Sequence, residues 1–111
     1  MKFEDIRYEE RDKRPGKQQG LVMPGGFWVQ KNTMRVAWEQ LHKNWPSIDW
    51  SRLQSAEDLI GAEFWAQQTF GMQLALGRCV RYFVRHDMLP RPLEVANPGK
   101  KGKRLYKLRR A

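Results

Sequence analysis

The sequence predicts a small α+β domain that is mostly helical, with a three-helix core and a C-terminal β-hairpin. Its 111 residues are 41% hydrophobic and include five Trp and five Phe, enough for one compact core. Apolar residues recur at helical spacing through the middle of the chain, and two alternating stretches near its end flank a basic, glycine-containing run. We expect the domain over residues 27–108, between a flexible arm at 1–26 and a basic tail at 109–111.

The arm is predicted because residues 1–26 are polar, charged and then rich in glycine, with too few apolar side chains to fold alone. Three of its basic residues could follow a nucleic acid backbone, but the neighbouring acidic residues oppose them, and we interpret the segment as a solvated linker. These basic residues are Lys13, Arg14 and Lys17. Residues 27–30, "FWVQ", are aromatic and β-branched, which favours a small strand that enters the domain.

The first helix is expected to begin near Asn32 or Thr33, because either side chain can accept a hydrogen bond from a free backbone N–H group of the first turn. Its apolar residues recur at steps of four, three and four, which places them on one face, and Pro46 closes the segment. This face is expected in the core and consists of Met34, Trp38, Leu41 and Trp45.

The second helix is expected from Ser55 to about Gln68. Ser55 can cap it, and Asp58 follows at the spacing of a capping box. Gly71 interrupts the apolar pattern, so "TFGM" is predicted to form a tight turn. A third helix then covers about residues 72–87, before Pro90 prevents its continuation.

The third helix is predicted to be amphipathic. Its apolar side carries Met72, Leu76, Cys79, Val80 and Phe83, and its open side carries Leu74, Arg78, Arg81 and Arg85. Gly77 lies within it, where glycine costs about 0.5–1 kcal/mol relative to alanine. Its presence indicates either close approach of the backbone to a phosphate or another helix, or tight packing against the second helix.

The basic run near the C-terminus is predicted to be the loop of a β-hairpin. Residues 93–95 and 104–108 alternate as strands do, and "ANPGKKGK" between them supplies the residues that turns require. Lys100, Lys101, Lys103 and Arg104 would then lie near the tip. A loose tail would have no need of an apolar strand on each side of its basic residues.

The charge distribution indicates a polyanionic partner. The net charge is +9, and residues 77–111 hold eleven Lys or Arg against two Asp or Glu, whereas residues 1–31 and 32–76 are close to neutral. A one-sided basic field is typical of nucleic-acid binding and sometimes of binding to anionic membranes. The sequence lacks a signal peptide and an apolar run of roughly 20 residues, so we expect a cytoplasmic protein without a membrane partner.

We expect no catalytic activity, cofactor or metal site. The single cysteine, Cys79, falls on the apolar side of its helix, as buried structural thiols do, and it excludes an internal disulfide. His42 and His86 are distant from it in the predicted elements, and one Cys with two separated His gives no zinc-ligand spacing. The segment "GKKGKR" lacks the Ser or Thr of a phosphate loop and lies between strands.

Two helices joined by a short glycine-containing turn and followed by a basic hairpin resemble the winged helix-turn-helix domains of DNA-binding regulators. The likeness covers about residues 33–108 and is carried by residues 55–90 and by "GKKGKRLYKL", which ends in the G-x-x-x-Y-x-L pattern common in such wings. Small phage, prophage and plasmid regulators are the comparable group. The second predicted helix is longer than is usual in this fold.

The resemblance implies a small transcriptional regulator that inserts its third helix into the major groove of duplex DNA. Base contacts would come from Gln73, Arg78 and Arg81, since Arg pairs with guanine and Gln with adenine. Contacts to the DNA backbone would come from Tyr82, Arg85, Lys100, Lys101, Lys103 and Arg104. Arg109 and Arg110 would add a nonspecific electrostatic contribution. The alternative for these cations is a solvated basic face.

Two other functions remain open. An RNA-binding or ribosome-associated module would use the same basic surface, with Tyr82 and Phe70 as exposed aromatics for unpaired bases. A protein–protein adaptor such as an antirepressor would instead expose Trp50 or Trp65. A homodimer would match a palindromic DNA site, and Phe27 and Trp28 are candidates for its interface.

Overall fold

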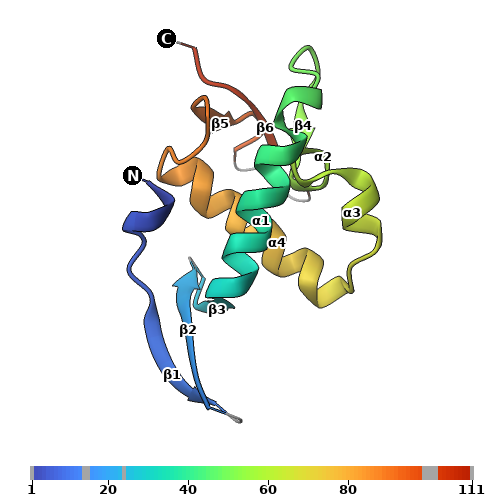
Figure 1. Ribbon diagram of the computed structural model, residues 1–111. Coiled ribbons are helices and arrows are strands. Elements are labelled where there is room, and N and C mark those ends of the chain that lie inside the picture. Colours follow the sequence, from blue (N-terminus) through green and yellow to red (C-terminus); the bar gives the residue numbers. More distant parts are fainter. Residues whose placement is uncertain (1, 14–15, 24, 99–102, 111) are drawn as a thin grey trace.

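Four α-helices and two small antiparallel sheets make up the computed structural model, which describes residues 2–13, 16–23, 25–98 and 103–110. In Figure 1 the first sheet lies at the lower end of α1, and the second sheet lies above α4, near the upper end of α1. The predicted α+β class is confirmed. Four helices are present where three were expected, because the second predicted helix is divided into two.

The first sheet occupies the segment that was expected to be a flexible arm. A short 3-10 helix, η1 (Phe3–Asp5), precedes β1 (Glu9–Lys13), β2 (Gly16–Met23) and β3 (Phe27–Gln30), which pair in that order. The strand expected at residues 27–30 is therefore confirmed. Ile6 and Met23 are buried in the same core as the helices, so the few apolar residues of this segment pack against α1 and α4 instead of one another.

Helix α1 (Lys31–Asn44) follows β3 without a loop. Its N-cap is Gln30, whose side chain makes no capping bond, so the predicted cap at Asn32 or Thr33 is wrong. Asn32 instead accepts a hydrogen bond from Arg35 within the first turn, at 2.6 Å. The predicted core face is confirmed: Met34 and Leu41 are fully buried and Trp38 packs against the core, as does Trp45 in the 3-10 turn η2 (Trp45–Ser47).

The second predicted helix is two short ones, α2 (Ala56–Ile60) and α3 (Ala62–Ala66), separated by Gly61. Gly61 has φ of +111°, a conformation that side chains rarely allow. Asn44 of α1 donates hydrogen bonds to the carbonyl oxygens of Asp58 and Leu59 at 2.9 and 3.1 Å, which satisfies the end of α2. The predicted capping box of Ser55 and Asp58 is confirmed.

Helix α4 (Phe70–Arg85) begins two residues before the predicted start. Thr69 caps it by accepting a hydrogen bond from the backbone N–H group of Met72, so Gly71 lies in the first turn and the predicted "TFGM" turn is wrong. The core side is buried as expected at Leu76, Cys79, Val80 and Phe83. A Cβ atom at Gly77 would meet nothing within 4 Å, so the prediction of tight packing there is also wrong.

The second sheet contains the predicted hairpin. Strand β6 (Leu105–Leu108) pairs on one side with β5 (Leu93–Val95) and on the other with β4 (Gln54–Ser55). Tyr106 of β6 is buried, at 2% exposure. Asn97 bridges the start of the loop, donating to the carbonyl oxygen of Lys103 at 3.0 Å and accepting from the N–H group of Leu105 at 2.8 Å.

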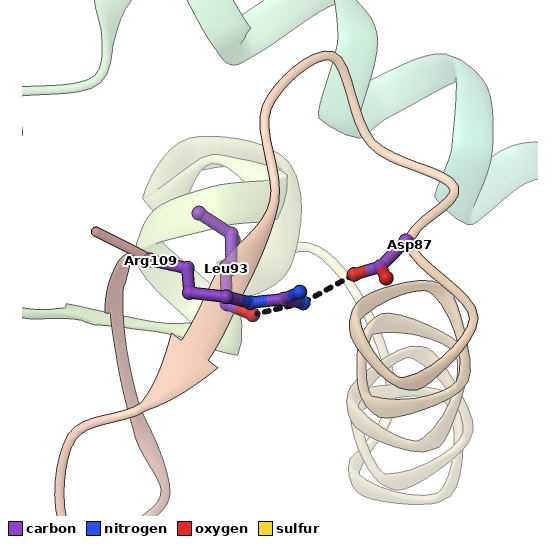
Figure 2. Close-up of polar contacts among 3 residues, drawn as sticks. All are labelled: Asp87, Leu93 and Arg109. Carbon is purple, nitrogen blue, oxygen red and sulfur yellow. Dashed lines mark hydrogen bonds and ion pairs between the residues drawn. The ribbon is translucent and has the colours of Figure 1, made fainter. Parts of the chain in front are cut away.

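Arg109 is part of the fold, although it was expected in a basic tail. Its guanidinium group forms an ion pair with Asp87 and a hydrogen bond with the carbonyl oxygen of Leu93 (Figure 2). Its backbone N–H group donates to the carbonyl oxygen of Pro92 at 2.9 Å. The end of β6 is therefore joined both to the start of β5 and to the turn that follows α4.

Gly20 provides a test of the first sheet. A Cβ atom there would lie 2.4 Å from the carbonyl oxygen of Val29 and 2.7 Å from the ring of Trp28. We expect Gly20→Ala to lower the free energy of unfolding by about 1–3 kcal/mol, the usual cost of overpacking. In the same strand, a Cβ atom at Gly16 meets nothing within 4 Å, so Gly16→Ala should not be destabilising. Urea titrations followed by circular dichroism measure both, and equal stabilities would contradict this packing.

Candidate nucleic-acid interface

An open groove of about 360 Å³ lies between α4 and the second half of the hairpin, where Lys103 and Arg104 lead into β6, and residues of α2 and α3 also line it. Its walls come from segments far apart in the sequence: Trp65 of α3, the Phe70–Arg81 side of α4, and Tyr106 of β6. The groove brings together residues of the helix and of the hairpin that the sequence predicted to contact DNA.

Four of the predicted cationic contacts line this groove. Arg78 and Arg81 come from α4, and Lys103 and Arg104 come from the hairpin. Glu57 is the acidic residue among the described residues of the lining. Lys100 and Lys101, which were predicted at the tip of the hairpin, lie outside the residues that the structure describes.

Tyr106 shows how closely the two sets of cations approach. Burial raises the pKa of the Tyr106 hydroxyl, and the positive charges of Arg104 and Arg81 oppose that rise. One arginine belongs to the hairpin and the other to α4, so both guanidinium groups act on the same phenol. Arg81 and Arg104 also line the same groove, so the helix and the hairpin both contribute positive charge to it.

The side chain of Gln73 forms hydrogen bonds with the backbone at this site. Its side-chain NH₂ group donates to the carbonyl oxygens of Trp65 at 2.9 Å and Gln68 at 3.4 Å. These bonds hold the connection between α3 and α4. A contact between this NH₂ group and a base would require both hydrogen bonds to break. The predicted contact with adenine therefore competes with the hydrogen bonds that Gln73 makes within the fold.

The remaining predicted contacts differ in their surroundings. The Arg78 guanidinium group stacks on the ring of Phe27 in β3 at 3.5 Å, whereas Arg81 and Arg85 are exposed. Tyr82 is half-buried and packs against His86, with ring centroids 4.3 Å apart. It lies about 100° around the helix from Arg81 and does not line the groove.

Phe70 and Leu74 were expected on an open surface, but the sequence did not predict that they form the apolar floor of a groove together with Trp65. Phe70 is 75% exposed and Leu74 is 44% exposed, and both line the groove with the half-buried Trp65. The spacing of residues 70, 74, 77 and 81 on one helix was the available signal. Trp65 joins this stripe because α3 turns away from α2 at Gly61.

No family model, curated protein or solved structure matches this chain. The interpretation of the groove therefore depends on its geometry. Among the helices that the structure describes, none has the length and apolar character needed to cross a bilayer. Within the same described residues, no cluster of three or more His, Cys, Asp or Glu could hold a metal ion.

Cys79, His42 and His86 have different surroundings in the fold. Cys79 is fully buried, and burial raises the pKa of its thiol to about 12, so the thiol is protonated at neutral pH. His42 lies against Trp38, with its Nδ1 atom 2.8 Å from the Trp38 carbonyl oxygen. His86 is exposed at the end of α4.

The role of Gln73 can be tested through stability. We expect Gln73→Ala to lower the free energy of unfolding by about 1 kcal/mol, since two backbone carbonyl groups lose a donor. Gln67→Ala, at an exposed position in the same connection, is the matched control and should have little effect. Thermal melts measure the difference. Unchanged stability of Gln73→Ala would mean that its side chain is free to contact a ligand.

The state of Cys79 can be tested with a thiol reagent. At pH 8 the folded protein should react with Ellman's reagent only as fast as it opens, because the thiol is both buried and protonated. In denaturing urea the reaction should be immediate. The raised pKa also means that the folded state retains a proton which the unfolded state loses above about pH 9, so this group makes the protein less stable as the pH rises further. Rapid labelling of the folded protein would contradict this assignment.

Proposed function

We propose that this protein binds duplex DNA through α4 and the β5–β6 hairpin, as a small regulator of the winged helix-turn-helix type. One observation carries the proposal: Arg81 of α4 and Arg104 of the hairpin line the same groove, together with Tyr106 of β6. A helix and a β-ribbon that share one cationic surface can contact a major groove and the adjoining phosphates together.

The order of the elements supports the proposal. Helix α1 is followed by β4, the α2–α3 pair, α4 and then the hairpin, and β6 lies between β4 and β5 in the sheet. In a winged helix-turn-helix domain the later helix of the pair enters the major groove and the hairpin is the wing. Helix α4 would be that helix, since it leaves Arg81 and Arg85 exposed one turn apart.

The cationic residues would make two kinds of contact, one with the bases and one with the phosphates. The exposed guanidinium group of Arg81 can donate two hydrogen bonds to guanine, which supplies sequence preference. Lys103 and Arg104 would contact phosphate oxygens, which fix the orientation of the protein but carry no sequence information. One face of the Arg78 guanidinium group is covered by the ring of Phe27, which holds the group in position. Its N–H groups would donate hydrogen bonds to the DNA from that position.

Arg104 and Lys107 form a matched pair for testing this assignment. Both are exposed cations in or beside β6, but Lys107 lies away from the groove, 3.7 Å from Glu94. We expect Arg104→Ala to reduce the slope of log affinity against log salt by about one unit, whereas Lys107→Ala, with the same change in net charge, should alter it much less. Fluorescence anisotropy with duplex DNA at several salt concentrations measures both slopes.

Arg81→Ala completes the experiment. With a duplex selected from a random library, it should cost about 1–3 kcal/mol of discrimination and leave the weak nonspecific binding largely intact. Equal effects of Arg104→Ala and Lys107→Ala would overturn the proposed surface. Preferential binding of duplex RNA or of single strands in the same assay would overturn the choice of duplex DNA.

A further inference from the structure

The groove has a floor that duplex binding does not explain. Phe70 is the most exposed large apolar side chain among the described residues, at 75%, and Leu74 lies one turn further along α4. Protein–DNA interfaces are strongly polar and positively charged, and a phenyl ring makes no favourable electrostatic contact with the phosphate backbone. Contiguous exposed apolar residues rimmed by charge mark interaction surfaces.

The shape of the floor suits an elongated segment. The α4 residues that line it run from Phe70 to Arg81, which corresponds to about 16 Å along the helix axis. Gly77 lies in the middle of this stretch, and the space where its side chain would be is open. The floor therefore has room for a partner side chain at Gly77, between Phe70 and Arg81.

The rim determines the chemistry of the occupant. Four cations line the groove, Arg78, Arg81, Lys103 and Arg104, against the single carboxylate of Glu57 in the described lining. An apolar partner without charge would leave these cations unpaired, and a basic partner would be repelled. A segment with apolar side chains on one face and carboxylates beside them satisfies both parts of the groove.

We propose that this groove binds an acidic amphipathic helix of a partner protein, with its apolar side chains on Phe70, Leu74 and Trp65 and its carboxylates at Arg81 and Arg104. Because the same arginines form the proposed DNA-binding surface, the helix and duplex DNA would exclude each other. Only that exclusion rests on the proposed function, since the fit of the helix depends on the floor and rim alone.

The probe is a blocked synthetic peptide of about 14 residues, long enough to cover the groove, with Leu every three or four positions and Glu beside them. Two control peptides replace every Glu by Lys or every Leu by Ser. Isothermal titration calorimetry should show micromolar binding of the first peptide and at least about tenfold weaker binding of each control. Equal binding of the Lys peptide, or no binding of the Glu peptide, would overturn the proposal.

Two glycines of α4 provide matched variants of the protein. An added Cβ atom meets nothing within 4 Å at either Gly71 or Gly77, but only Gly77 lines the groove. We expect Gly77→Leu to weaken binding of the Glu peptide at least about tenfold and Gly71→Leu to leave it unchanged, with both proteins folded. Equal affinity of the two variants would place the peptide elsewhere and contradict the proposal.

Phe70→Ser separates this inference from DNA binding. It should weaken binding of the peptide strongly, while duplex affinity changes by less than about threefold because the cations remain. If duplex binding fails in the wild-type protein but the peptide binds as expected, the inference stands without the exclusion. If sedimentation shows that the chain self-associates and that Phe70→Ser abolishes this, the occupant is a second copy and the proposal is overturned.

Discussion

The packing of α4 against α1 is the contact on which the rest of this structure depends. Leu76, Cys79 and Phe83 from one helix and Met34 and Leu41 from the other are fully buried, and the edge of Phe83 meets the face of Trp38 with centroids 5.2 Å apart. Burial of these side chains is the main favourable contribution to folding. It also decides which side of α4 is left to solvent, so the exposure of Leu74 and Arg81 is a consequence of the core.

Backbone hydrogen bonding explains how the other elements are placed around this pair. Asn44, at the end of α1, satisfies carbonyl groups of α2 and allows the chain to turn at Gly61. Thr69 and Gln73 then close the connection from α3 into α4. Each of these contacts satisfies a polar group that a helix end leaves without an intrahelical partner. Together they bring Trp65 next to α4, and the groove exists because of that proximity.

Local patterns were sufficient for the features that depend on neighbouring residues. The core faces of α1 and α4, the capping box at Ser55 and the strands of the hairpin follow from spacing within a few residues. Apart from β3, the first sheet could not be predicted, because Ile6 and Met23 belong to the same core as the distant helices. The break at Gly61 likewise depends on a side chain from α1. At the site, the arginines of α4 could be predicted from their spacing, but the apolar floor could not, since Trp65 reaches it only after that break.

The link between Arg109 and Asp87 affects how the hairpin can respond to a ligand. It joins the end of β6 to the turn after α4, and Asn97 closes the base of the loop, so the described ends of the hairpin are fastened at two points. The end of β6 therefore stays close to the turn after α4. A partner would thus meet a preorganised surface, and association would lose less conformational entropy than it would with a hinged ribbon.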